Sequence, residues 1–173
     1  MNVTDSTATA VTTATERLRV EWPAVRALWK SAVSGAFASV GADGSPHVAP
    51  IGSVYLHPTE PRGYYHPILT ARLRKDLTER AQFELLFVQP RALPWLVGLL
   101  RGRFEQPIAV RLRGRALGPR RPTTEAERAH FQRRVRWVRW TRGYELLWKD
   151  IRFVQELAFE DVVPIRLGAM PNG

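Results

Sequence analysis

A short turn between two apolar segments constrains the fold of this chain more than any other feature. Residues 36–40 are apolar, residues 42–46 read Ala-Asp-Gly-Ser-Pro, and a second extended segment follows over residues 47–56. Asp-Gly and Ser-Pro are typical of turns, so the pattern predicts an antiparallel hairpin. On its second strand, Pro50 cannot donate a ladder hydrogen bond and indicates an edge or a bulge. Gly52 leaves room for close approach to the backbone.

The remaining elements follow without a regular strand–helix–strand repeat. Apolar residues at helical spacing predict a helix over residues 16–33, and Thr124–Glu127 is a capping box that begins another. The other predicted elements are strands over 63–67, 83–88, 107–117 and 153–165, and helical segments over 70–81, 90–106 and 144–150. This order indicates an α+β fold with an antiparallel barrel, in one domain over residues 16–173. Residues 1–15 are rich in Thr, Ala and Ser, and we expect a disordered leader there.

The positive charge of the chain is concentrated in one region. The formal net charge is +10, and residues 101–142 contain 13 Arg and 3 Glu, so the rest of the chain balances to zero. Such a local excess favours an anionic partner: a phosphorylated cofactor, a nucleic acid or acidic groups on a neighbouring subunit. The alternative is a coding bias, because the chain uses 23 Arg and only 3 Lys.

Composition excludes several classes of protein. The sequence has no Cys, which excludes disulfides and thiolate chemistry and suits a reducing cytoplasm. No apolar run approaches the roughly 20 residues that cross a bilayer, and the first residues do not read as a signal peptide. We therefore expect a cytoplasmic protein with no membrane partner. The histidines lack metal-ligand spacing, and neither a nucleophile elbow nor a Gly-rich phosphate loop is present.

Two segments together carry a family resemblance. Residues 37–50 read Phe-Ala-Ser-Val-Gly-Ala-Asp-Gly-Ser-Pro-His-Val-Ala-Pro, and residues 70–77 read Thr-Ala-Arg-Leu-Arg-Lys-Asp-Leu ahead of an apolar strand. The first segment is similar to the opening strand, Asp-Gly turn and Pro-His-Val-x-Pro strand of the pyridoxamine 5′-phosphate oxidase-like, FMN-binding split-barrel family. The second stands where many relatives carry Arg-Lys-x-x-Asn-Leu. The resemblance implies a six-stranded antiparallel split β-barrel with flanking helices.

The resemblance also implies a homodimer with a flavin in a groove between the subunits. The phosphate would lie at the start of the helix over residues 70–81, where Arg72 matches the arginine of the family motif. The usual Lys is replaced by Leu73, and Asp76 stands where Asn is common, so Lys75 or Arg74 would supply the missing cation. This departure leaves deazaflavin or haem, both used by relatives of the fold, as alternatives to FMN. The ring would pack on the second strand, at Ala49, Pro50, Ile51, Gly52 and Ser53.

Elementary chemistry favours the same helix start as a phosphate site. A helix N-terminus offers unpaired amides and a partial positive charge. Thr70 adds a hydroxyl and Arg72 a planar fork of donors. The alternative is that Arg72 and Lys75 form only a solvated helix face. His66 is a candidate contact, although we favour a strand-end histidine bonded to backbone. Candidates to complete the pocket from the partner chain are Trp137, Arg139 and Trp140.

The leading hypothesis is therefore an FMN-binding, oxidoreductase-like homodimer with a small-molecule substrate and no assignable catalytic residue. A second hypothesis is a non-catalytic protein that stores or senses flavin or haem. A third, less favoured, is a nucleic-acid binder, because Arg and Trp interleave over residues 133–142. We expect the leucine-rich segment 93–100 to act as a lid or to pack on the partner subunit rather than to contact a membrane.

Overall fold

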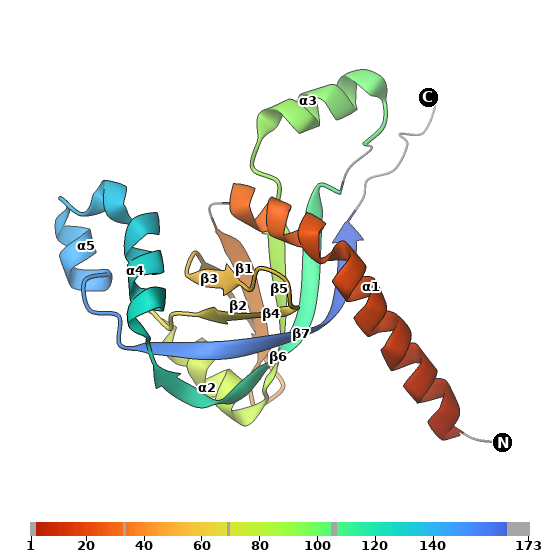
Figure 1. The fold of residues 1–173 in the computed structure, drawn as a ribbon, viewed down its shortest axis with the longest axis horizontal. Helices are drawn as coiled ribbons and strands as arrows, with labels where there is room; N and C mark the ends of the chain where they lie inside the picture. The colour runs from red at the N-terminus through yellow and green to blue at the C-terminus, as the bar shows by residue number, and fades with distance from the viewer. Residues whose placement is uncertain (1–2, 33, 69, 105–106, 166–173) are drawn as a thin grey trace.

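The protein folds around one antiparallel sheet that curls upon itself (Figure 1). The computed structural model describes residues 3–32, 34–68, 70–104 and 107–165. The strands are β1 (Gly35–Val40), β2 (Pro46–Ile51), β3 (Val54–Leu56), β4 (Arg62–Tyr65), β5 (Gln82–Val88), β6 (Ala109–Pro122) and β7 (Phe153–Ile165). The helices are α1 (Val3–Ser31), α2 (Ala71–Glu79), α3 (Ala92–Arg101), α4 (Glu125–Arg134), the 3₁₀-helix η1 (Arg136–Val138) and α5 (Arg142–Leu147).

The order of the strands explains why the sheet curls. The order is β2-β1-β5-β6-β7-β4-β3, so β2 and β3 lie at opposite edges. Only Gly52 and Ser53 separate the end of β2 from the start of β3. Two residues span at most about 7 Å, so the two edges must meet. We call this link, Gly52–Ser53, the seam of the barrel. Ser53 holds it closed, because its Oγ donates to the carbonyl of His66 (2.7 Å) and its own carbonyl accepts from the His66 amide (3.2 Å).

The two longest strands supply the bend between the halves of the barrel. β6 and β7 pair along most of their length, with register shifts at Arg113/Gly114 and Leu117/Arg121. Such irregularities increase the local twist and bend of a strand. Gly114 is required at the first shift, since a Cβ there would lie 2.2 Å from the carbonyl oxygen of Ala158.

The core fills the barrel and extends under α1. Phe37, Leu85 and Leu112 are completely buried inside the sheet. α1 covers one opening with Trp22 and Trp29, both buried, whose indole N–H groups donate to the carbonyls of His57 and Val54 at 3.0 Å. A buried indole N–H needs such a partner, so these bonds fix the angle at which the helix crosses the barrel.

The structure confirms the predicted fold class and corrects some boundaries. The Asp43–Gly44 hairpin, the edge position of Pro50 on β2 and the Thr124–Glu127 capping box are all present. Seven strands replace the expected six, because the second strand breaks at the seam. α1 begins at Val3, so helix continues through the segment that we expected to be a disordered leader. Among the described residues, no helix combines the length and apolar character needed to cross a bilayer.

The seam makes a stability prediction. Replacing Ser53 with Ala removes the buried bond to the His66 carbonyl and should lower the free energy of unfolding by about 1 kcal/mol. Urea denaturation followed by circular dichroism measures this change. Ser34, which is exposed just before β1, provides the matched control: Ser34→Ala should change stability by less than half as much. Equal losses in both variants would contradict the role assigned to Ser53.

Candidate functional site

The start of α2 and the β1–β2 hairpin form one polar groove. The Arg72 guanidinium donates from Nη2 to Ser45 Oγ (3.0 Å), and Ser45 Oγ donates to Asp43 Oδ1 (2.6 Å). The hydrogen bonds from the Ser45 side chain and backbone, with the nearby charge of Arg72, hold the pKa of Asp43 below its usual value. A cavity of about 600 Å³ lies here, lined by Gly41, Ala42, Asp43, Ala71, Arg72, Lys75, Asp76 and Glu79. Arg72 and Lys75 therefore face the same space.

Thr70 stands at the start of α2, directly before the groove residue Ala71. It is the N-cap residue of α2 and is 9% exposed, yet its side chain makes no capping hydrogen bond. Its Oγ1 is buried within the protein beside the Tyr65 phenol, so this hydroxyl offers no surface to the groove. The donors that the helix start does offer are the first amides of α2, because the N–H groups of the first turn have no acceptor within the helix.

The next positions of α2 divide between core and solvent. Leu73, which replaces the lysine common in relatives, is completely buried, so this position supplies no cation. Lys75 is exposed, with its Nζ 3.9 Å from Glu79 Oε1. Asp76 is buried and turns toward the hairpin: it accepts from Ser39 Oγ (2.7 Å) and lies 3.3 Å from His47 Nδ1. Asp76 thus holds α2 against β1 and β2.

The strand positions expected to support a flat ring lie on the edge strand β2 and the seam. Ile51 and Ser53 are buried, Pro50 and Gly52 are exposed, and Ala49 is half-buried. Because β2 begins beside Ser45, these positions start roughly 13 Å from the Arg72 contact at the usual rise per strand residue. The proposed phosphate and ring positions therefore lie along one strand, in this order.

His66 lies away from the groove, in the core. It has no exposed surface, and its ring makes edge contacts with Tyr55, Tyr64 and Phe131. Its Nδ1 lies 3.4 Å from the carbonyl oxygen of Phe153, and its Nε2 has no partner. This is the strand-end, backbone-bonded arrangement that we favoured. In this chain His66 offers no surface to a ligand.

The Arg–Trp segment lies on another part of the fold. Trp137 belongs to η1 and Trp140 follows it, and they are 74% and 86% exposed. The Trp140 indole donates to the Trp137 carbonyl (3.0 Å), and Arg139 is exposed beside them. Within one chain these residues do not line the α2 groove. Any contact with a cofactor there would come from a partner subunit.

A second hollow was not anticipated from the sequence. It has a volume of about 600 Å³ and lies between α1 and α4, with Trp29, Tyr55, Tyr64 and His130 among its lining residues. At one side Arg121 binds Glu127 (2.7 Å) and Glu156 (2.8 Å). Burial alone would raise the pKa of Glu127, but the hydrogen bonds from Arg121 and Thr124 lower it to about 2. These residues come from distant segments, so no local sequence pattern predicts the hollow.

Across the described residues, no cluster of His, Asp and Glu is suited to a metal.

Comparison with known families agrees with this geometry. The sequence model of the family described as "Pyridoxamine 5′-phosphate oxidase" matches residues 22–163. That range runs from α1 to the end of β7 and contains both the groove and the seam. The chain belongs to this family. No curated protein matches the sequence.

Solved structures show that the chain has the split-barrel fold of the pyridoxamine 5′-phosphate oxidase family. An FMN-binding protein from Syntrophomonas wolfei is 14% identical, with a TM-score of 0.53 over 88% of this chain and 97% of that one. HutZ, the haem storage protein from Vibrio cholerae, is 12% identical, with a TM-score of 0.55 over 85% and 95%. An F420 reductase is 11% identical, with a TM-score of 0.54 over 80% and 94%. At these identities the similarity establishes the fold alone.

The buried His66 predicts how stability depends on pH. Burial lowers its pKa to about 4, below the value near 6.5 in an unfolded chain. A lowered histidine pKa means that the unfolded state binds the proton more readily. Stability from the neutral ring is therefore present at pH 7 and falls as the pH drops from 6.5 toward 4. We expect a loss of roughly 1–2 kcal/mol between pH 7 and pH 5.

Urea unfolding at the two pH values tests this expectation. His66→Gln, which cannot titrate, should show most of the pH dependence removed. His130 also has a pKa lowered by burial, but it is more exposed, so His130→Gln should remove less. An unchanged pH dependence in the His66→Gln variant would contradict the assignment.

Proposed function

We propose that this chain is an FMN-binding, oxidoreductase-like protein that works as a cytoplasmic homodimer on a small-molecule substrate. The observation that carries the proposal is the groove at the N-terminus of α2, which is lined by two exposed cations, Arg72 and Lys75. Membership of the pyridoxamine 5′-phosphate oxidase family supports the proposal. So does the fold shared with proteins named for FMN, haem and F420.

The groove residues fit a phosphate group. Helix amides, a hydroxyl donor and a guanidinium are the usual partners of phosphate oxygens. Arg72 donates one hydrogen bond to Ser45. Because a guanidinium has five N–H groups, further donors can face a ligand. Among the acidic residues that line the groove, Asp43 accepts a hydrogen bond from Ser45 and Asp76 accepts one from Ser39. Glu79 instead pairs with Lys75, and both of these side chains are exposed to solvent. Lys75 would then be the second cation.

The ring of the cofactor would lie at Ala49–Ser53, against the edge strand and the seam. Exposed Gly52 lets a flat group approach the main chain, and Pro50 presents no amide that needs a ladder partner. We propose that Trp137, Arg139 and Trp140 of the partner subunit close this site, since they are exposed in one chain and large aromatic side chains favour interfaces.

A bound flavin supplies the redox chemistry, and the protein supplies binding, orientation and electrostatics. In this chain Arg72, Lys75 and the first amides of α2 would anchor the phosphate end. β2 would set the position of the ring relative to that anchor. The Asp76 contacts to Ser39 and His47 keep α2 and the hairpin at a fixed separation, which maintains the spacing between the two ends of the site.

Flavin titration of the purified protein tests the proposal. FMN should bind at least about tenfold more tightly than riboflavin, which lacks the phosphate. Lys75→Met, which removes the second exposed cation of the groove, should weaken FMN binding about fivefold with riboflavin affinity little changed. Arg72→Met should weaken FMN binding more, by about tenfold or beyond, with riboflavin affinity little changed.

Arg19→Met, which removes an exposed arginine from α1, is the matched charge control and should bind FMN as the natural protein does. Equal affinity for FMN and riboflavin, or full FMN affinity in the Arg72→Met variant, would contradict a phosphate site in the α2 groove. A purified protein whose spectrum shows haem and not flavin would favour the storage or sensing function instead.

A further inference from the structure

α3 presents apolar side chains that the fold leaves uncovered. Its outer side carries Leu93, Leu96, Leu99 and Leu100, which are 68%, 53%, 57% and 78% exposed. Their spacing puts them on one side of the helix. We call these four residues the leucine face. Contiguous exposed apolar residues on a soluble domain mark an interaction site more often than single ones do.

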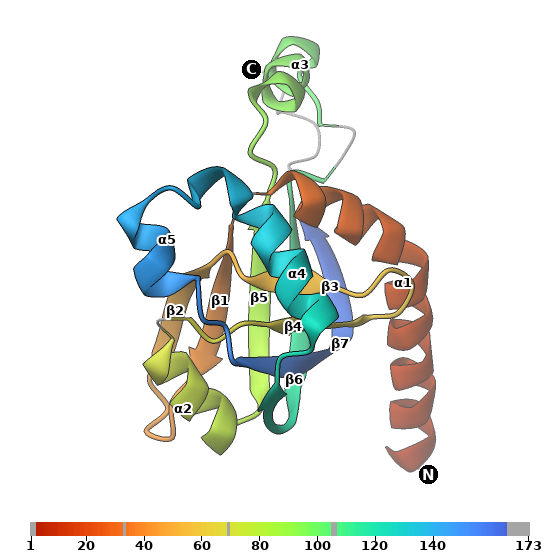
Figure 2. The same ribbon diagram turned by 60° about the vertical axis from the view of Figure 1, so that its left-hand side comes forward.

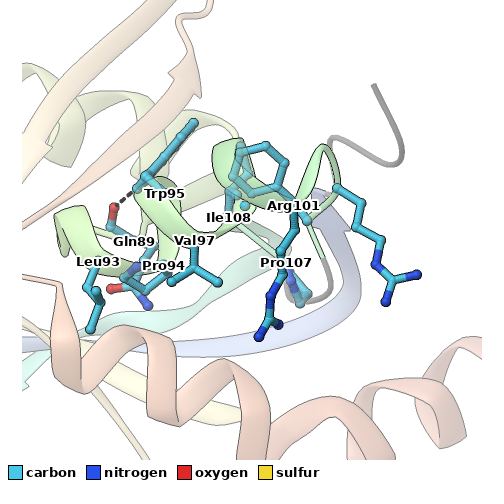
Figure 3. Close-up of a pocket in the computed structure, with 11 residues that line it drawn as sticks. Gln89, Leu93, Pro94, Trp95, Val97, Arg101, Pro107 and Ile108 are labelled. Carbon is cyan, nitrogen blue, oxygen red and sulfur yellow. Dashed lines mark hydrogen bonds between the residues drawn. The ribbon is translucent and has the colours of Figure 1, made fainter. Parts of the chain in front are cut away.

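The opposite side of α3 is already occupied by the protein's own residues. The rings of Trp95 and Phe104 meet edge to face at 5.5 Å, and Gly98 is buried where a Cβ would lie 2.5 Å from the Phe104 ring. The Trp95 indole donates to the Gln89 carbonyl (3.3 Å), as Figure 3 shows. Gly102, in the left-handed region, ends the helix with hydrogen bonds to the carbonyls of Gly98 and Leu99. The helix is therefore held with its leucine face outward.

The position of α3 excludes a lid role within its own chain. In two views α3 projects from one end of the barrel, whereas α2 lies at the other end (Figures 1 and 2). The groove is lined by residues of α2 and of the β1–β2 turn, so it also lies away from α3. The sequence interpretation as a lid therefore cannot apply to the groove of the same chain. A projecting helix can also reach a flat surface before the barrel itself touches it.

The charges beside the leucine face favour one kind of occupant. From Gln89 to Pro107 the sequence has three arginines, Arg91, Arg101 and Arg103, and one glutamate. Arg91 precedes the first turn of α3, Arg101 is its last residue and Arg103 follows it. Arg101 and Arg103 also line the hollow beneath the helix. Two copies of α3 packed about a two-fold axis would bring arginines of one copy toward those of the other, which disfavours self-pairing. On an anionic membrane, leucines can enter the apolar layer while the arginines next to them bind the negatively charged headgroups.

In place of the lid or subunit contact expected from the sequence, we propose that α3 docks on an anionic lipid surface, with the leucine face inserted at the headgroup boundary and the flanking arginines among the headgroups. The helix lies on the membrane and does not cross it. The proposal is independent of the cofactor, because the leucine face and the α2 groove lie at opposite ends of the molecule.

Sedimentation with sucrose-loaded vesicles tests the proposal on the full chain. Vesicles of phosphatidylcholine with 30% phosphatidylglycerol should bind the protein about fivefold or more better than pure phosphatidylcholine at low ionic strength, and salt should weaken the difference. Leu100→Glu should lower binding about tenfold. Arg101→Gln should lower binding to the anionic vesicles while leaving the weak binding to neutral ones unchanged.

Leu146→Glu on α5 is the matched control, because Leu146 is 73% exposed and receives the same charge change. It should retain binding to within twofold. Binding that survives Leu100→Glu, or that Leu146→Glu reduces equally, would overturn the proposal. A second result would also overturn it: the natural protein binds neither kind of vesicle, and Leu100→Glu halves its mass in light scattering. The leucine face would then be covered by a second copy of the chain. Melting curves of each variant confirm that the fold is intact.

Discussion

The link between β2 and β3 is the constraint on which the rest of the structure depends. Two residues, Gly52 and Ser53, join strands at opposite edges of a seven-stranded sheet, so the sheet has to close. Closure buries His66 beside Ser53 and brings the chain after β4 round to the hairpin, where α2 begins. The proposed ring and phosphate positions are therefore products of the same closure. Under the proposed function, the edge strand β2 would form part of a binding surface instead of an exposed edge that invites aggregation.

The proposed phosphate site depends on donors that the fold leaves facing solvent. Ser53, Asp76 and the indoles of α1 all have partners within the chain. Arg72 is different, because its guanidinium is exposed, lines the groove and gives one hydrogen bond to Ser45 out of its five N–H groups. The first amides of α2 have no acceptor within the helix. A phosphate would accept from Arg72, from Lys75 and from these amides together.

Local signals in the sequence predicted the local structure well. The Asp43–Gly44 turn and the Thr124–Glu127 capping box act within a few residues, so the pattern alone located them. The break of the second strand at Gly52 depends on closure of the distant sheet edges, and no local signal reports that. The site divides in the same way: Thr70 and Arg72 followed from a helix start and a family motif. The bond from Arg72 to Ser45, the core position of His66 and the outward face of α3 depend on tertiary packing.

A crystal structure of the protein grown with FMN tests the central claim most directly. Phosphate density is expected within hydrogen-bonding distance of the Arg72 guanidinium and the first amides of α2, with the flavin ring against Ala49–Ser53. Flavin density in the hollow between α1 and α4, or a groove that holds no FMN, would contradict the proposed site.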